Sequence, residues 1–539
     1  MRVKGLSALW LVVVMVVIVS PLLAQPSIPK EKIPAEALPD VKAAIAELYS
    51  QDVETRGQAA ARLGDYGSQA APAIPFLIAM LGDTAEITEN CCPTSPGQKA
   101  SEALGSIGEA AVAPLTAALE DKDPKVRERA AEALGQIKTP TATKSLLNAL
   151  RNREPSVRRN AASALSERAL AGVVEAVLPL LQDPDLMVRK QAAATLATMG
   201  DSRVVEPMLP LLKDQSALVR AAATESLGKM GDLRATEPLL AMLQDPDPTV
   251  RTAAVRSLSR MGDRRAKDPL LAAFTDLSPG VRIALLEAFG RSSNKKTGDL
   301  VLAAVKDENP AVRAAALQQI EYYNTEQAKK KANLIEVFLG ALKDENPEVR
   351  KTAISALSTL KGARAIAGLM GAVNDPDPEV RAGLAQALPE TEDPAVAEAL
   401  LAYLKDPEPQ VRSAAAVGLG KLQEERAVEP LITMLQGTNL LTRVAAAGAL
   451  SQIENSRALE PLLALTSDPN AHVRAAAVNA LRKFSDPRAE AAVKAALEDN
   501  NQMVRSAAVR GFEEEELYYY ADMSGGGEAG GAGSLWEGE

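Results

Sequence analysis

The sequence predicts an all-α fold, a right-handed α-solenoid of about fifteen helical hairpins with a period of 31 residues. Three observations support this fold class: a Val-Arg pair that returns at constant phase, a helix start and stop in each repeat, and a composition with only 3% aromatic residues. Alanine-rich, aromatic-poor chains suit close-packed helices better than sheets, which favour aromatic and β-branched residues. At 539 residues, the chain is also longer than one ordinary core requires.

The repeat is clearest in one column of thirteen arginines, separated by steps of 31 residues and a single step of 37. Valine precedes every member except Arg443, which follows Thr442. Two irregular copies precede the column, around Arg56 and within residues 97–108. The repeats should therefore fill residues 41–512. The column consists of Arg127, Arg158, Arg189, Arg220, Arg251, Arg282, Arg313, Arg350, Arg381, Arg412, Arg443, Arg474 and Arg505.

The stretch 245–263 shows how one repeat is built. Asp247 is a helix N-cap and Pro248 occupies the first helical position. Apolar residues then recur at helical spacing as far as Gly262, which ends this first helix. A second helix follows in residues 265–274. One hairpin cannot bury its apolar face alone, so neighbouring hairpins must stack, and we expect the second helices to line the inner, concave face.

These features resemble the HEAT-repeat family, in particular its short, bilin-lyase-like variety. The resemblance rests on the Val-Arg pair, on an Asp six residues before the Arg, and on a proline in the second helix, and it covers nearly all of residues 41–512. The second-helix prolines are Pro207, Pro238, Pro269, Pro430 and Pro461. The resemblance implies the solenoid but not one function, since such folds include scaffolds, adaptors and a few enzymes.

The arginine column allows two interpretations. It could line a groove for an anionic polymer, or it could form a structural ladder with the aspartates, because arginine suits bidentate pairing with carboxylates. We favour the ladder, as the family resemblance also implies; only Asn152 and Gly437 interrupt the acidic column. The aspartates are Asp121, Asp183, Asp214, Asp245, Asp276, Asp307, Asp344, Asp375, Asp406, Asp468 and Asp499.

Outside the repeats, residues 1–24 resemble an export signal, with two basic residues before the apolar run 8–24. Cleavage after Ala24 is expected; the alternative is an uncleaved signal anchor. A Pro-rich linker follows in residues 25–40, and residues 513–539 should form an acidic, Gly-rich, disordered tail. The net charge is -10, and the mildly acidic body argues against nucleic-acid binding. Membrane contact is expected only if the N-terminal segment is retained.

Four further features are candidate sites. Cys91 and Cys92 could form a vicinal disulfide, a link to a second chain or free thiols; they lie in an extended loop, residues 83–98, that is either functional or simply relaxed. Tyr322 and Tyr323, in the expansion 320–338, form either a contact patch or part of a longer hairpin. The tail is either inert or a linear motif whose aromatic anchors are Tyr518, Tyr519, Tyr520 and Trp536.

The sole histidine, His472, occupies a position that is variable among the repeats, so we interpret it as an exposed helix residue. Di-iron chemistry of the HEAT-repeat hydroxylase type needs several His-Glu pairs and is disfavoured. No catalytic residue, metal or cofactor is expected. The sequence favours an exported scaffold or adaptor that binds protein partners, in the periplasm, cell envelope or extracellular space. The alternative is a bilin-lyase-like enzyme or cofactor-handling factor.

Overall fold

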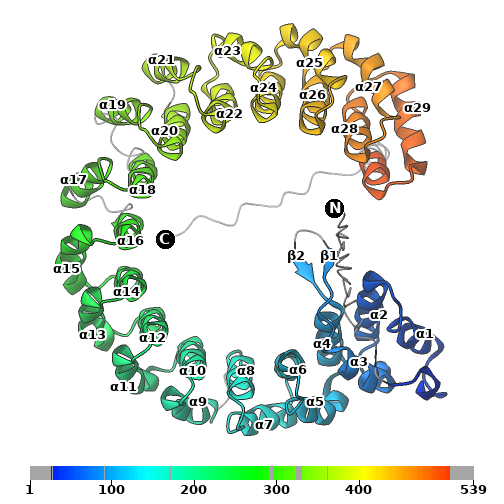
Figure 1. Ribbon diagram of the computed structural model, residues 1–539, viewed down its shortest axis with the longest axis vertical. Helices are drawn as coiled ribbons and strands as arrows, with labels where there is room; N and C mark the ends of the chain where they lie inside the picture. Colours follow the sequence, from blue (N-terminus) through cyan, green and yellow to red (C-terminus); the bar gives the residue numbers. More distant parts are fainter. Residues whose placement is uncertain are drawn as a thin grey trace, which may run out of the picture. The chain divides into compact units, whose positions relative to one another are not determined.

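The computed structural model describes residues 26, 28–89, 92–168, 172–289, 295–322, 331–360 and 362–509. Helices occur in consecutive pairs along the whole of this part of the chain, as the solenoid prediction requires (Figure 1). The chain divides into two compact units, Met1–Leu285 and Leu286–Glu539, and the division falls inside α16 (Pro279–Phe289). Each unit is described by itself.

The described part of the first compact unit contains seven first helices before α16, and the last five of these carry the Val-Arg pair. Its second helices are shorter and often continue as 3-10 turns. The first helices are α2 (Val53–Asp65), α4 (Pro96–Ile107), α6 (Pro124–Gln136), α8 (Pro155–Leu165), α10 (Leu186–Met199), α12 (Ala217–Met230) and α14 (Pro248–Met261). Helix α1 (Pro39–Glu47) precedes them, and the second helices are α3 (Ile74–Met80), α5 (Val112–Ala118), α7 (Pro140–Ala149), α9 (Val173–Val177), α11 (Val205–Met208), α13 (Thr236–Ala241) and α15 (Lys267–Ala272).

The second compact unit repeats the same order of helices. Its first helices are α18 (Pro310–Tyr322), α20 (Pro347–Leu360), α22 (Pro378–Ala387), α24 (Pro409–Lys421), α26 (Leu440–Ile453) and α28 (Ala471–Leu481), and residues 502–509 are also helical. Its second helices are α17 (Lys295–Ala304), α19 (Lys331–Ala341), α21 (Ala363–Gly371), α23 (Val396–Tyr403), α25 (Val428–Leu435), α27 (Leu459–Leu465) and α29 (Pro487–Ala495).

The two helix layers lie opposite to our expectation. Within each compact unit, the first helices line the inner side of the curve and the second helices the outer side (Figure 1), so the prediction of an inner second helix is wrong. The reason is the size of the residues between neighbouring first helices. A Cβ atom on Gly228 would lie 2.3 Å from the Ser257 side chain, and one on Gly420 would lie 2.8 Å from the Ala449 Cα atom. Helices that approach this closely occupy the shorter, inner arc.

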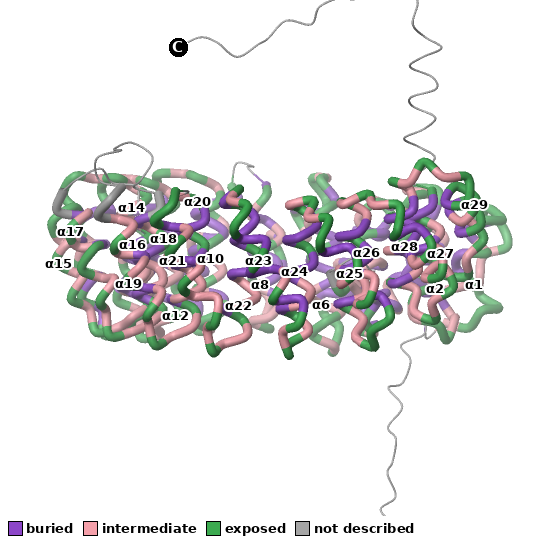
Figure 2. The backbone as a smooth tube through the Cα atoms, turned by 90° about the horizontal axis from the view of Figure 1, so that it is seen from above, coloured by how far each residue is buried: buried purple, intermediate pink, exposed green. Residues whose placement is uncertain are grey.

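The local signals at the helix ends act as the sequence indicates. The Asp247 carboxylate accepts a hydrogen bond from the Thr249 amide at 2.8 Å, with Pro248 at the first helical position. Gly262 ends α14 with φ 65°, a left-handed conformation in which a side chain would be strained. Seen from the side, buried residues lie along the middle of the helices, and exposed residues gather at the helix ends and loops (Figure 2).

One departure from helical structure is a two-stranded antiparallel hairpin, β1 (Ile87–Glu89) and β2 (Cys92–Thr94). Its register pairs Ile87 with Thr94 and Glu89 with Cys92. The expected loop 83–98 therefore contains a hairpin, and its last residues form the first turn of α4. Alternating short polar and apolar residues gave no strand signal long enough to predict it.

The predicted linker packs on the first helix of the chain. Lys30 lies 5.0 Å from the centre of the Tyr49 ring, and the Tyr49 hydroxyl donates a hydrogen bond to the Ile28 carbonyl. Ala37 is buried, and α1 begins at Pro39. The segment 28–38 therefore belongs structurally to the first repeat. Among the described helices, none is both long and apolar enough to span a membrane.

Candidate functional site

Each regular repeat is joined to the next by one arginine. Arg251 donates from Nε and Nη2 to the two carboxylate oxygens of Asp276, at 2.6 and 2.9 Å. Its Nη1 donates to the backbone carbonyls of Asp245 and Pro246, at 2.8 and 3.1 Å, which end the preceding second helix. The arginine therefore bonds to the carbonyl of its own repeat's Asp and to the carboxylate of the next repeat's Asp.

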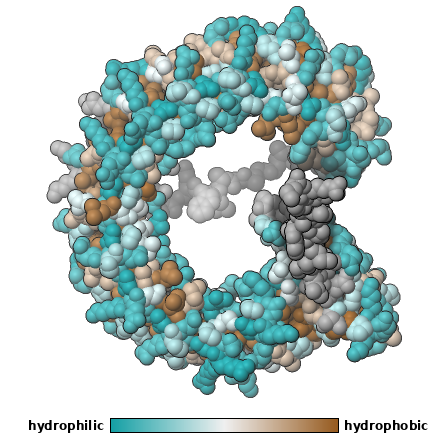
Figure 3. Space-filling model, in the orientation of Figure 1, coloured by the Kyte–Doolittle hydropathy of each residue, from teal (hydrophilic) through white to brown (hydrophobic). Residues whose placement is uncertain are grey.

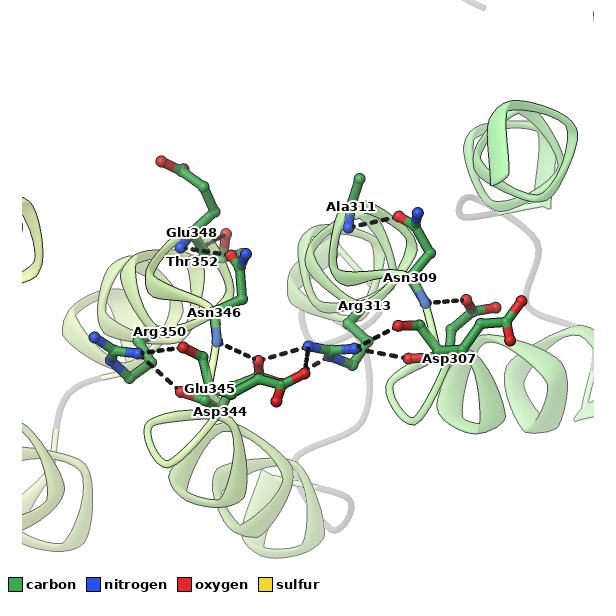
Figure 4. A network of polar contacts seen from close by, with 11 residues as sticks. Asp307, Asn309, Ala311, Arg313, Asp344, Glu345, Asn346, Glu348, Arg350 and Thr352 are labelled. Carbon is green, nitrogen blue, oxygen red and sulfur yellow. Dashed lines mark hydrogen bonds and ion pairs between the residues drawn. The ribbon is translucent and has the colours of Figure 1, made fainter. Parts of the chain in front are cut away.

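The same bidentate contact recurs in both compact units, and Figure 4 shows it between Arg313 and Asp344. The pairs are Arg158–Asp183, Arg189–Asp214, Arg220–Asp245, Arg251–Asp276, Arg313–Asp344, Arg350–Asp375, Arg381–Asp406 and Arg474–Asp499. Arg443 contacts Asp468 through Nη1. The pairs are mostly buried: the exposed fractions are 14% for the Arg381 side chain and 7% for that of Asp406.

The electrostatics of the pairs favour the charged forms. The hydrogen bond from Arg381 lowers the pKa of Asp406 below its ordinary value, more than burial raises it. Burial raises the pKa of Asp183, but the hydrogen bonds and charge of Arg158 outweigh it and lower that pKa overall. These groups are thus satisfied ion pairs whose acceptors and donors are already used.

The ladder changes where the acidic column changes. Arg127 donates to the Ser156 hydroxyl at 3.1 and 2.9 Å, because Asn152 stands where the next Asp would be. Arg412 donates only to the carbonyls of Asp406 and Pro407, at 2.6 and 2.7 Å, since Gly437 offers no carboxylate.

The ends of the column keep only part of the pattern. Asp121 accepts a hydrogen bond from the Asp123 amide, and its carbonyl accepts one from Arg127. At the other end of the column, Arg505 donates to the Asp499 carbonyl. In the middle of the column, Arg282 donates to the Asp276 and Leu277 carbonyls at 2.7 and 3.3 Å, as the regular arginines do in their own repeats. The Asp307 carboxylate accepts a hydrogen bond from the Asn309 backbone amide at 2.8 Å.

Sequence reasoning missed one member of the ladder, Arg56. Its Nε donates to Asp83 at 2.8 Å, and its Nη1 donates to the Ser50 and Gln51 carbonyls at 3.0 and 3.2 Å. Arg56 is fully buried. The first repeat lacks the Val before its arginine, but the Gly-Asp pair at 82–83, which ends α3, was an available signal.

A second buried arginine holds the base of the hairpin. Arg129 of α6 donates from Nη1 to the Asp83 carbonyl at 3.0 Å and from Nη2 to the Ser95 hydroxyl at 2.8 Å. Gly97 leaves room for it, because a Cβ atom there would lie 2.1 Å from Nη1 of Arg129. Burial lowers the pKa of Arg129. The hairpin is therefore fixed to the inner helices at its base.

A second, exposed ladder runs along the second helices and was not predicted. In six repeats, an arginine near the start of the second helix contacts a glutamate 28 residues earlier, in the previous repeat. For three of these arginines, Arg203, Arg426 and Arg457, the sequence signal is a Glu-Pro pair that begins three residues later. The pairs are Arg203–Glu175, Arg265–Glu237, Arg364–Glu336, Arg426–Glu398, Arg457–Glu429 and Arg488–Glu460.

The inner helices present one exposed column, the fifth residue after each ladder arginine (the +5 column). Every described member is exposed, although the helix around it is packed. The surface of this face is mainly hydrophilic (Figure 3). The column consists of Glu132, Ser163, Ala194, Glu225, Arg256, Glu287, Gln318, Ser355, Gln386, Val417, Gly448 and Asn479.

The remaining sequence candidates are scattered. His472 is exposed, and its backbone amide donates to the Asn470 side chain at 2.9 Å near the start of α28. Cys92 lies in β2 and Tyr322 is the last residue of α18. Cys91, Tyr323, the tail tyrosines and Trp536 lie outside the described residues. Within the described part of the chain, no group of three His, Cys, Asp or Glu side chains is arranged to hold a metal ion.

Comparisons with known proteins agree with this architecture. The family described as HEAT repeats matches residues 97–166, 143–227, 205–290, 268–331, 298–388, 369–440 and 428–513. A comparison with curated protein sequences finds no match. Among solved structures, yeast importin-β (Kap95p) is similar with a TM-score of 0.52 and 15% identity, over 92% of this chain and 83% of that chain. Kap95 in its complex with Nup1 gives a TM-score of 0.56 at 15% identity, with the same coverage. At this identity, the likeness shows the fold alone.

Proposed function

Because this chain belongs to the HEAT-repeat family, we propose that it is an exported scaffold that binds protein partners along the exposed face of its inner helices. It performs no chemical step in this role. The finer proposal is that its repeats are of the short, bilin-lyase-like type, as the 31-residue period and the Val-Arg pair indicate. The type of repeat does not carry lyase activity with it.

The observation that carries the proposal is a contrast between two columns on the same helices. The valine before each ladder arginine is nearly invariant and, from Val157 to Val504, no such valine is more than 1% exposed. Six residues further along, the +5 column is exposed in every described repeat and varies among acidic, basic, amide, small and apolar residues. A constant buried frame therefore presents a variable surface, which is how repeat proteins build extended binding faces.

Two further features support the proposal. The ladder arginines are used in bonds between repeats, so the basic column is not a free anionic-polymer site. The Kap95 structure with Nup1 is a complex of a similar fold with a protein partner. Export is inferred from residues 1–24 alone, and the proposed compartment is the periplasm, cell envelope or extracellular space.

The test is capture of partners from envelope extract by the purified chain and two charge-matched variants. The inner variant carries Gln318→Arg, Gln386→Arg and Asn479→Arg, all exposed +5 positions. The outer variant carries three arginines at exposed alanines of second helices, Ala241, Ala402 and Ala495. Both gain the same charge. Loss of captured proteins by the inner variant alone supports the proposal; equal loss, or loss by the outer variant alone, refutes it.

A further inference from the structure

A groove lies between the inner helices α6, α8 and α10 of the first compact unit. Its volume is 630 Å³, and its walls come from three successive first helices and the turn after α8. Polar side chains of Glu132, Asn160 and Gln191 line it, and Met187 supplies an exposed apolar edge.

The groove coincides with an interruption of an alanine column. The second residue after the ladder arginine is alanine in most repeats. In three consecutive repeats it is instead Arg129, Asn160 and Gln191. Two of these polar residues line the groove, and Arg129 holds the hairpin base beside it. The alanines are Ala222, Ala253, Ala284, Ala315, Ala414, Ala445, Ala476 and Ala507.

Asn160 carries an unmet hydrogen-bond donor. Its side chain is 8% exposed, and its Oδ1 accepts hydrogen bonds from Nε and Nη2 of Arg159, at 3.2 and 3.1 Å. Its Nδ2 is buried and has no acceptor among the described residues. Leaving a buried donor unpaired is destabilising, and alanine at this position would avoid the cost. The arrangement is accounted for by an acceptor on a bound molecule.

The charge of the groove is acidic. Glu128, Glu132 and Glu167 line it with one cation, Arg159. Glu128 is paired with Lys125 at 2.8 Å, on the rim. Burial, and then the negative charge of Glu128, raise the pKa of Glu132, and the opposing effects of the Arg129 charge and of a hydrogen bond from the Gln98 side chain do not cancel that rise. A cation bound beside Glu132 would offset the repulsion between Glu132 and Glu128.

We propose that this groove binds an extended basic peptide of a partner protein, with a peptide main-chain carbonyl accepting from Nδ2 of Asn160 and Lys or Arg side chains pairing with Glu132 and Glu167. Met187 contacts a neighbouring apolar side chain of the peptide. An extended basic peptide provides both groups that the groove needs: main-chain carbonyls that accept from Asn160, and cationic side chains that pair with Glu132 and Glu167. The chain's own tail is excluded by charge, because residues 513–539 contain seven Glu and one Asp but no basic residue. This inference rests on the proposed scaffold function and names the partner's chemistry at one site.

The experiment measures binding of the full chain to an array of fluorescein-labelled extended peptides in which paired Lys or Arg residues stand among neutral and apolar ones. A matched array replaces each basic residue with Glu. The groove variants are Asn160→Ala, which installs the residue of other repeats, and Glu132→Gln with Glu167→Gln. The control is Glu206→Gln, an exposed carboxylate of an outer second helix that lies outside both the +5 column and the groove.

We expect the basic peptides alone to bind, with affinity that falls as salt rises. The double glutamine variant should weaken binding at least tenfold and Asn160→Ala about fivefold, while Glu206→Gln leaves it unchanged. Asn160→Ala should keep or raise thermal stability, so its loss of binding is not unfolding. Absence of basic-peptide binding, or an equal effect of the control variant, overturns the inference. If binding fails here while the inner-face variant still loses its captured partners, only the groove assignment falls and the scaffold function stands.

Discussion

Restoring the missing carboxylate at Gly437 should strengthen the weakest step of the arginine ladder. Gly437 lies 25 residues after Arg412, the spacing that places Asp406 against Arg381. Its amide donates to the Met434 carbonyl at 3.1 Å, as the Asp406 amide donates to Tyr403 at 3.0 Å, so the backbone already has the required turn. Gly437 is not among the described residues with positive φ. Gly437→Asp should therefore pair with Arg412 in a bidentate contact.

The magnitude follows from the equivalent native pair. Arg381 and Asp406 are linked by hydrogen bonds of 2.8 and 3.0 Å, with side chains 14% and 7% exposed. Hydrogen bonds to charged groups contribute about 1.5–3 kcal/mol, and desolvation of the new carboxylate offsets part of this. The net gain from the pair should be about 2 kcal/mol. Replacing glycine adds about 0.5 kcal/mol by restricting the unfolded chain, which Gly437→Ala measures separately.

The assay is amide hydrogen exchange resolved by peptide, because solenoids open locally and a single unfolding transition would average over many repeats. Exchange in α24 and α26 should slow about 30-fold in Gly437→Asp relative to Gly437→Ala, the factor that corresponds to about 2 kcal/mol. The second cycle variant, Arg412→Met, should remove this gain entirely. Equal exchange in the Asp and Ala variants, or a gain that persists without the arginine, would refute the bidentate account of the ladder.

Three other outcomes follow from the same contacts. Arg129→Met should lower the local stability of the hairpin by about 2 kcal/mol, because two buried acceptors lose their donor. The hairpin amides should therefore exchange faster, while exchange in the helices of the second compact unit stays the same. Unchanged hairpin exchange contradicts this prediction. Gly228→Ala should cost about 1–3 kcal/mol in α12 and α14, since its Cβ atom would lie 2.3 Å from the Ser257 side chain, and Ser257→Gly should recover part of the loss. Because Arg381 lowers the folded pKa of Asp406, its stabilisation is complete above the unfolded value of about 3.9 and is lost as pH falls through the lower folded pKa. Acid titration of local exchange should show that loss, and Asp406→Asn should flatten it.

The helix starts and stops of the repeats were predictable from the sequence because the same signals recur in each regular repeat. The Asp-Pro helix start and the glycine stop recur in phase, so the hairpins follow from local rules. Spacing alone did not show which arginine each aspartate binds. The Asp245 carboxylate accepts from Arg220 of the previous repeat, whereas the Asp245 backbone carbonyl accepts from Arg251 of its own repeat. That assignment needed the stacking geometry.

The assignment of inner and outer layers failed for a related reason. Both helices carry an apolar stripe, and a stripe shows which face is buried but not which layer has the shorter arc. The decisive residues were small ones at the contacts between first helices, such as Gly228 and Gly420. Arg56 was missed as a ladder member because no valine precedes it. The exposed ladder was missed because each of its pairs joins residues 28 apart that lie in different repeats.

The uniform ladder also bears on how this gene could change length. Every regular step joins an arginine to an aspartate 25 residues later with the same four bonds. Duplication or deletion of one 31-residue segment within a run such as Arg158 to Asp276 would leave each surviving arginine facing an aspartate of the correct register. An inserted repeat would therefore form all of its arginine–aspartate contacts immediately. Selection could then act directly on the residues of its exposed +5 position and on what they bind. A copied segment that includes Asn152 or Gly437 would instead lack the aspartate that pairs with the preceding arginine. We therefore expect recent duplications to have occurred within runs of regular arginine–aspartate pairs.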